Sequence, residues 1–263
     1  MIAEPVSLRL RRAAQQTGSL LCLGLDPVGA DSAASAERQC RDLIDACLEH
    51  CVAAKPNLAF FEQFGSPGVA VLERIRTHLG DRCMVILDGK RGDIGNTAAA
   101  YGRALFDVWG ADAITVNPLM GRDSVEPLMQ RPGTLVFLLS RTSNPGAADF
   151  LEQPMHDGRP LRTHIVNTAA TWSGAAEIGF VVGATNPAAI ADTRAQAPEA
   201  TLLLPGVGAQ GGDLEAAVRA GIDAAGAGTL ISVSRGISCA ENPGAAAKQL
   251  RERIVAAISA TQV

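Results

Sequence analysis

The chain has 263 residues, of which 47% are hydrophobic and 19% are charged, and its formal net charge is -4. This composition is enough for one large core and excludes the basic surface that nucleic-acid binding requires. No apolar run reaches the ~20 residues of a membrane-spanning helix, and the first residues lack the basic and apolar regions of a signal peptide, so we expect a cytoplasmic protein.

Segments with the apolar pattern of buried strands alternate with segments that have the periodicity of helices. A helix is expected first, at 4–16. The strand-like segments lie at 19–25, 54–61, 84–90, 113–117, 134–139, 178–182, 201–204 and 229–233. The helices that follow them are expected at 35–53, 67–79, 94–107, 121–130 and 161–176, from 186 onward, between 213 and 221, and at 242–260. The polar segment 140–162 is the longest connection, and such loops tend to be functional or mobile.

This alternation predicts parallel strands joined by right-handed crossovers. Eight strand-and-helix units close most naturally into a (β/α)8 barrel, the TIM barrel, with its active site at the carboxyl ends of the strands. No change of composition marks a domain boundary, so one barrel domain is expected over 1–263. An open doubly wound sheet is the alternative, because alternation does not show closure.

Opposite charges gather at the end of the third predicted strand. In a strand from Met84 to Lys90, Asp88 and Lys90 are two residues apart and share one face. Asp93 lies beyond the strand, in a turn flanked by glycines, just before the next helix. The strand is apolar on both faces, as buried parallel strands are, and the glycines leave room for a ligand. The pattern favours a catalytic site, and a solvated turn with a surface ion pair is the alternative.

A glycine-rich segment follows the seventh predicted strand. Residues 206–211 match Gly-x-Gly-x-x-Gly, but no acidic residue ends the following strand to bind the ribose of a dinucleotide. Glycines at a strand-to-helix turn expose backbone N–H groups to an anion, and Arg235 after the eighth strand adds a guanidinium. Because loops seven and eight form the usual phosphate site of these barrels, phosphate binding is favoured over a tight turn and a surface arginine.

The six cysteines, at 22, 40, 47, 51, 83 and 239, include no Cys-x-x-Cys pair. Buried free thiols are therefore expected. Cys47, His50 and Cys51 could share a helix face as metal ligands, but no second pair with ligand spacing completes the site. We predict no metal.

The charged motif resembles the signature of orotidine 5'-phosphate decarboxylases. Asp88-Gly-Lys90-Arg-Gly-Asp93-Ile94 with Thr97 matches Asp-x-Lys-x-x-Asp-Ile-x-x-Thr. The similarity continues in the family's order through 25–26, 55–62, 143–146, 205–212 and 234–235. The Lys-Pro-Asn stretch that starts at 55 and the long loop after the fifth strand are similar to the longer bacterial subfamily, type 2.

The resemblance implies a cofactor-free decarboxylation of orotidine 5'-phosphate to UMP, the last step of pyrimidine nucleotide synthesis. It implies that Lys90 donates a proton to C6 and that Asp88 lies against the leaving carboxylate. Lys55 and Asp93 would alternate with them in a charge network. It also implies a homodimer in which Asp93 and Thr97 reach the partner's active site.

The same resemblance implies a set of substrate-binding residues. Asp26 would hold the ribose hydroxyls, Ser143 would contact the pyrimidine, and Gln210 and Arg235 would bind the phosphate. The complete set is Asp26, Ile94, Thr97, Ser143, Gln210, Ser234 and Arg235.

The chemistry of the residues agrees with this reaction. Loss of CO2 from C6 leaves a carbanion without an attached electron sink, and an ammonium such as that of Lys90, flanked by Asp88 and Asp93, can stabilise the charge and then donate a proton. One alternative is a Mg2+-dependent sugar-phosphate decarboxylase or aldolase of the same superfamily, although Lys55 stands where a metal ligand would be needed. The other is a non-catalytic nucleotide-binding barrel, which has no need of two carboxylates and two ammonium groups.

Overall fold

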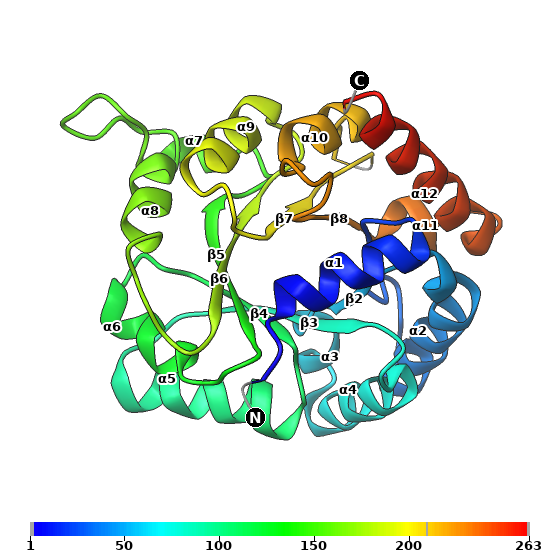
Figure 1. The fold of residues 1–263 in the computed structure, drawn as a ribbon. Helices are drawn as coiled ribbons and strands as arrows, with labels where there is room; N and C mark the ends of the chain where they lie inside the picture. The colour runs from blue at the N-terminus through cyan, green and yellow to red at the C-terminus, as the bar shows by residue number, and fades with distance from the viewer. Residues whose placement is uncertain (1–2, 209, 262–263) are drawn as a thin grey trace.

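The computed structural model describes residues 3–208 and 210–261. Eight parallel strands pair in sequence order, and β8 pairs back to β1, so the sheet is a closed barrel (Figure 1). The TIM-barrel prediction is confirmed, and the open-sheet alternative is wrong. The strands are β1 (Leu21–Leu25), β2 (Ala53–Pro56), β3 (Met84–Arg91), β4 (Ala113–Val116), β5 (Leu135–Arg141), β6 (Glu177–Val182), β7 (Leu202–Pro205) and β8 (Thr229–Val233).

Helical segments connect successive strands and cover the outside of the barrel (Figure 1). None of the described helices is long and apolar enough to cross a membrane. They are α1 (Val6–Thr17), α2 (Ala33–Cys47), η1 (Leu48–His50), α3 (Ala59–Glu62), α4 (Gly65–Leu79), α5 (Gly95–Gly102), η2 (Arg103–Val108), α6 (Arg122–Val125), η3 (Glu126–Met129), α7 (Ala147–Phe150), α8 (Leu161–Ala169), α9 (Pro187–Gln196), α10 (Leu214–Gly221), α11 (Arg235–Ser238) and α12 (Pro243–Ser259).

Asn-Pro pairs start two of these helices where the sequence predicts them. The side-chain oxygen of Asn186 accepts a hydrogen bond from the backbone N–H of Ala189 at 3.0 Å. Asn242 caps α12 in the same way through Ala245, also at 3.0 Å. Each cap satisfies an N–H that has no partner within the helix, and proline tolerates the next position because its missing N–H is not needed there.

The second predicted strand, at 54–61, is wrong in its second half. Strand β2 ends at Pro56, and α3 begins three residues later at Ala59. Proline has no N–H to continue the ladder. The side chain of Asn57 accepts from the N–H of Ala59 at 3.3 Å, which turns the chain into the helix.

Other boundaries also differ from the predictions. The helix expected at 35–53 ends at Cys47, and the one expected at 161–176 ends at Ala169. The helix expected at 94–107 changes to a π-helix in η2, and that expected at 121–130 divides into α6 and η3. The long connection at 140–162 contains the end of β5 and the short helix α7, and α11 was not predicted. Apolar periodicity does not encode such short elements, because a single turn offers too few positions.

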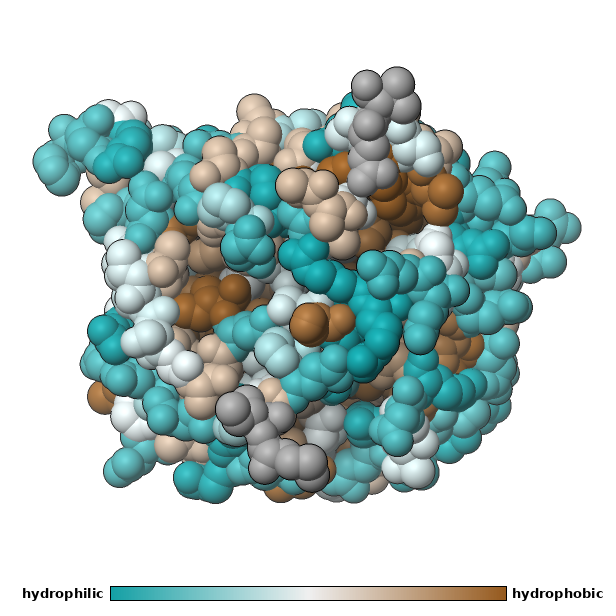
Figure 2. Space-filling model, viewed as in Figure 1, coloured by the Kyte–Doolittle hydropathy of each residue, from teal (hydrophilic) through white to brown (hydrophobic). Residues whose placement is uncertain are grey.

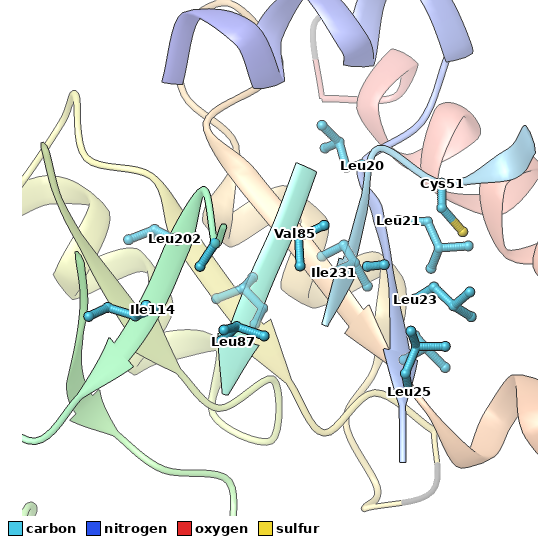
Figure 3. Close-up of a cluster of buried hydrophobic side chains, with 14 of the residues drawn as sticks. Leu20, Leu21, Leu23, Leu25, Cys51, Val85, Leu87, Ile114, Leu202 and Ile231 are labelled. Carbon is cyan, nitrogen blue, oxygen red and sulfur yellow. The ribbon is translucent and has the colours of Figure 1, made fainter. Parts of the chain in front are cut away.

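Strand side chains divide between two packed layers. One layer faces the helices, and Figure 3 shows Leu21, Leu23 and Leu25 of β1 pointing to that side. The other layer fills the barrel interior and includes Ile86 and Phe137. Because both faces of β1 are buried, its sequence is apolar throughout instead of alternating.

Helix α1 closes the amino-terminal end of the barrel. It lies across the strands in Figure 1, and its Val6 and Leu10 pack with the interior layer. The face seen in Figure 2 is mostly polar, with hydrophobic residues in separate patches. The interior of the barrel is therefore packed at its amino-terminal end, and a pocket opens at the opposite end.

Replacement of Leu10 by alanine should test this closure. Leu10 is 7% exposed, and Leu8 on the same helix is 47% exposed. We expect Leu10→Ala to lower the free energy of unfolding by about 2–4 kcal/mol, because it leaves a cavity beneath the barrel. We expect Leu8→Ala to change it by less than about 0.5 kcal/mol. Urea denaturation followed by circular dichroism measures both, and equal effects would contradict the closure.

Candidate active site

A pocket of about 210 Å³ opens at the carboxyl ends of the strands. Its walls come from residues at or just after the ends of the strands, from β1 round to β8. Eight of the residues predicted from the sequence line it: Asp26, Lys55, Asp88, Lys90, Ser143, Gln210, Ser234 and Arg235. The fold therefore brings together side chains that are more than 200 residues apart in sequence.

The carboxylate of Asp88 is the centre of a charge network in this pocket. Its Oδ2 accepts from Lys55 Nζ at 2.8 Å, and its Oδ1 accepts from Lys90 Nζ at 2.7 Å. Lys55 and Asp88 are almost fully buried, at 6% and 8% exposure, whereas the side chain of Lys90 is 47% exposed. Asp88 and Lys55 thus form a buried ion pair, and the side chain of Lys90 extends from Asp88 into the open pocket.

The two lysines determine the charge of Asp88. Burial alone would raise the pKa of this carboxyl, but Lys55 and then Lys90 outweigh burial and hold the pKa well below its ordinary value. Burial alone would lower the pKa of Lys55, but Asp88 and Asp26 raise it above its ordinary value. Asp88 and Lys55 are therefore both charged at neutral pH.

The backbone at Lys90 departs from the regular strand that the sequence predicts. Lys90 has a φ of +46°, the only positive φ of a non-glycine residue within 3–208 and 210–261. The β3–β4 pairing shifts between Leu87 and Arg91, so β3 bulges there. Asp88 and Lys90 meet as predicted, but through a bulge instead of by regular alternation. Positive φ is costly for a residue with a side chain, and such strain is common at functional sites.

Thr115 and Asn57 are among the pocket residues that the sequence analysis missed as site residues. Thr115 of β4 donates its hydroxyl to Asp88 Oδ1 at 2.8 Å, and Asn57 lines the pocket just after β2. Asn57 stands two residues after Lys55, and this spacing near a predicted site residue could have indicated that Asn57 lines the site. Thr115 sits inside an apolar strand, and its contact depends on the strand register.

The glycine-rich segment forms a wall of the same pocket. Gly206, at a φ of +100°, packs so closely that a Cβ would lie 2.9 Å from Ser143 Cβ and 3.0 Å from Gln210 Oε1. Arg235, which follows the neighbouring strand β8, lines the same pocket. The predicted meeting of loops seven and eight is confirmed, except that Ala209 lies outside the described residues.

Two buried oxygens in the pocket wall have no hydrogen-bond partner within the described chain. They are Asp26 Oδ1 and Ser234 Oγ. Buried polar atoms are nearly always paired, so each such atom calls for an explanation. Their place in the pocket wall makes a polar ligand the natural partner.

Three predicted site residues do not line the pocket. Asp93 is half-buried and uses Oδ1 to accept from the N–H of Ile94 at 2.8 Å. Ile94 is 57% exposed, and Thr97 is also exposed. Of the two carboxylates expected to flank Lys90, only Asp88 forms an ion pair with it within the described part of this chain.

The comparison with known protein families shows which family the chain belongs to. The sequence model of the family described as "Orotidine 5'-phosphate decarboxylase / HUMPS family" matches residues 19–250, which include every residue of the charge network. The chain belongs to this family. The resemblance noted from the Asp-x-Lys-x-x-Asp motif is confirmed.

Relatives and solved structures agree with this family. The orotidine 5'-phosphate decarboxylase of Roseiflexus castenholzii is 42% identical over 267 residues, covering 95% of this chain and 97% of that protein. The structure of Leishmania donovani OMP decarboxylase has a TM-score of 0.90 and 43% identity, covering 95% of this chain and 98% of that one. The Leishmania donovani UMP synthase structure has a TM-score of 0.93 and 44% identity, and the match covers 97% of this chain but only 57% of that longer one.

The metal site considered at Cys47, His50 and Cys51 is not supported in this member of the decarboxylase family. All six cysteines are free, and four are buried. Burial raises the pKa of Cys47 to about 11 and also raises that of Cys51, which disfavours the thiolate that binds metals. Within residues 3–208 and 210–261, no three His, Cys, Asp or Glu side chains are placed to hold a metal ion.

Replacing Lys55 by alanine should test the electrostatic base of the site. The change leaves the buried Asp88 with Lys90 as its remaining ion-pair partner in the described chain, so we expect a loss of about 3–5 kcal/mol of unfolding free energy at pH 7. Lys248→Ala, at an exposed position of α12, is the control and should change stability by less than about 0.5 kcal/mol.

The same variant should change the dependence of stability on pH. The folded-state pKa of Asp88 lies below its ordinary value of 3.8, so the unfolded chain takes up the proton first as pH falls. Stability from this group is thus present above pH 3.8 and is lost below it. Without Lys55 the folded-state pKa rises towards the unfolded value, so this group contributes less stability at neutral pH, and the variant should lose less stability as pH falls below 3.8. Thermal unfolding between pH 3 and 7 measures this, and unchanged acid sensitivity would contradict it.

Proposed function

We propose that the network of Lys55, Asp88 and Lys90, completed by Asp93 of a partner subunit, carries out the decarboxylation without a metal or cofactor. The chain is a carboxy-lyase that converts orotidine 5'-phosphate to UMP and CO2 in pyrimidine nucleotide synthesis, as family membership and its close relatives indicate. The observation that carries the proposed mechanism is the buried carboxylate held between two ammonium groups at the mouth of the barrel.

Lys90 is the proposed proton donor. Its ammonium uses one contact on Asp88 and reaches an open pocket, so its other N–H groups can face C6 of the substrate. As the C6–CO2 bond breaks, the positive charge stabilises the electron pair left on C6, and the ammonium then transfers a proton to it. Because Asp88 and Lys55 are already fixed in place, little reorganisation is needed during the reaction.

Asp88 is proposed to lie against the substrate carboxylate. Two like charges held close together raise the energy of the bound substrate, and this repulsion is relieved when neutral CO2 leaves. The low pKa of Asp88 supports this role, since the carboxyl does not become protonated to avoid the repulsion.

The rest of the pocket is proposed to bind the ribose, base and phosphate. Asp26 has an unpaired buried oxygen that can accept from a ribose hydroxyl. Ser143 also lines the pocket and is proposed to contact the pyrimidine, while Gln210, Ser234 and Arg235, which line it as well, are proposed to bind the phosphate. Binding energy from the remote phosphate would order these loops around the reacting ring, and so contribute to rate as well as affinity.

The Mg2+-dependent alternative belongs to the same family model, whose description includes HUMPS. The relatives compared above are orotidine 5'-phosphate decarboxylases. The ammonium of Lys55 lies 2.8 Å from Asp88 Oδ2, where it would repel a divalent cation. These observations support the metal-free reaction.

Turnover in the presence of a chelator tests the proposed mechanism and separates its rivals. We expect purified protein in EDTA to remove the ultraviolet band of orotidine 5'-phosphate, and Lys90→Ala to slow this by at least about 10²-fold. Lys248→Ala is the control for loss of a lysine charge away from the pocket. Turnover of sugar phosphates that requires Mg2+ would support the sugar-phosphate rival. UMP binding without turnover of either substrate would support the non-catalytic barrel.

We also propose that the enzyme is a homodimer in which Asp93 and Thr97 complete the partner's active site. Both residues stand outside the pocket of their own chain, next to an exposed hydrophobic surface. Ile94, Leu119 and Met120 are each more than half exposed, at 57%, 57% and 52%. They follow β3 and β4 on the rim that carries the pocket, so covering them with a second copy would bring Asp93 towards a neighbouring site.

Mixing two inactive variants tests this arrangement. In a dimer of Lys90→Ala with Asp93→Ala, one site lacks both groups and the other has both. Random exchange of subunits makes about half of the dimers mixed, so we expect about one quarter of wild-type activity to return. If Asp93 served its own chain, no mixed dimer would have an intact site, and activity would not return.

We propose one barrel domain over residues 1–263 and a location in the cytoplasm. The barrel draws on strands from Leu21 to Val233, with α1 and α12 packed against it. All six cysteines are free, which suits a reducing compartment. Assignment to the longer bacterial subfamily, type 2, stays a prediction.

A further inference from the structure

Thr115 contacts both members of the Asp88–Lys90 ion pair through a single hydroxyl group. The residue lies on β4 and is 2% exposed. Its Oγ1 donates to Asp88 Oδ1 at 2.8 Å and accepts from the backbone N–H of Lys90 at 3.0 Å. The directions are fixed by chemistry, because an ionised carboxylate can only accept and a backbone N–H can only donate.

The hydroxyl stands where the strand ladder is interrupted. Leu87 pairs with Ile114, and pairing resumes where Arg91 pairs with Val116. Four steps along β3 therefore correspond to two along β4, and Thr115 is the single residue opposite the bulge. The N–H of Lys90 points to the threonine side chain instead of to a carbonyl of β4.

This contact supports the unusual backbone of Lys90. A φ of +46° is unfavourable for lysine and persists only when surrounding contacts hold it. The Thr115 hydroxyl holds the backbone N–H of Lys90, and the Asp88 carboxylate holds its Nζ at 2.7 Å. The same hydroxyl also donates to that carboxylate. The backbone N–H and the Nζ of Lys90 are therefore both positioned by Thr115 Oγ1, the first directly and the second through Asp88.

We propose that Thr115 is a positioning residue that sets the place of the Lys90 ammonium relative to the reacting carbon. It does so by fixing the bulge of β3 and the orientation of the Asp88 carboxylate together. The inference rests on the proton-donor role proposed for Lys90. Without the hydroxyl, Asp88 keeps both lysines, but Lys90 loses the contact that fixes its backbone.

Three substitutions at position 115 separate the hydroxyl from the rest of the side chain. Thr115→Val keeps the shape and removes the hydroxyl, Thr115→Ser keeps the hydroxyl and removes the methyl, and Thr115→Ala is a second hydroxyl-free variant. Thr229→Val is the matched control, because Thr229 is also a strand threonine of 2% exposure whose hydroxyl donates within the fold, to the carbonyl of Gly221. Thr229 does not line the pocket.

We expect Thr115→Val and Thr115→Ala to lower kcat by about 10²-fold, the usual effect of displacing a reacting group by an ångström. KM and UMP affinity should change by less than about threefold, since the ribose and phosphate contacts stay in place. Thr115→Ser should recover most of the wild-type kcat, and Thr229→Val should lose stability without losing kcat. A general effect of destabilisation would not separate kcat from KM in this way.

Several outcomes would overturn the proposal. One is a kcat for Thr115→Val within threefold of wild type, and another is a Thr115→Ser variant as slow as Thr115→Val. If neither hydroxyl-free variant folds, the hydroxyl is a requirement of the barrel and not a positioning device. Absence of turnover in the wild-type protein would instead contradict the proposed mechanism, so the two failures are distinguishable.

Discussion

The buried carboxylate of Asp88 is the constraint on which the site depends. A charged group at 8% exposure is strongly unfavourable unless opposite charges and hydrogen bonds surround it. Here β2 supplies Lys55, β3 supplies Lys90, and β4 supplies Thr115, each within 2.8 Å of a carboxylate oxygen. These three strands are neighbours in the barrel, so the parallel order of the sheet determines which groups can meet. The network therefore depends on the pairing of β3 with β2 and with β4.

The barrel is asymmetric along its axis, and the asymmetry makes room for chemistry. At the amino-terminal end, Val6 and Leu10 of α1 pack with the interior layer. At the carboxyl end, that layer gives way to the charged and hydroxyl side chains that surround a pocket of about 210 Å³. The filled end provides the rigid packing that holds the strands in register, and the register then fixes the charges to within hydrogen-bond distance.

Sequence periodicity could predict the eight strands, because parallel strands buried on both faces form continuous apolar runs. It could also predict the Asn-Pro helix starts and the pairing of Asp88 with Lys90, since these depend on neighbours in sequence. It could not predict that β2 would stop at Pro56 or that Lys90 would adopt a φ of +46°. The role of Thr115 depends on a shift in pairing between two strands, and no local pattern in β4 reports it. Sequence thus located the charges, while the bulge that aims them emerged only from the assembled sheet.

The pocket of a single chain holds one of the two carboxylates that were expected to flank Lys90. The network contains two ammonium groups and the carboxylate of Asp88, with Asp26 nearby, whereas Asp93 lies on the rim outside the pocket. In the proposed dimer, each pocket would gain a second carboxylate near Lys90, that of the partner's Asp93. Each chain would also cover the exposed Ile94 of the other chain. The hydrophobic surface that drives association and the carboxylate that completes catalysis would then be adjacent residues on one turn. Loss of the dimer would expose apolar surface and disable both sites at once, so assembly and activity would be coupled through residues 93–97.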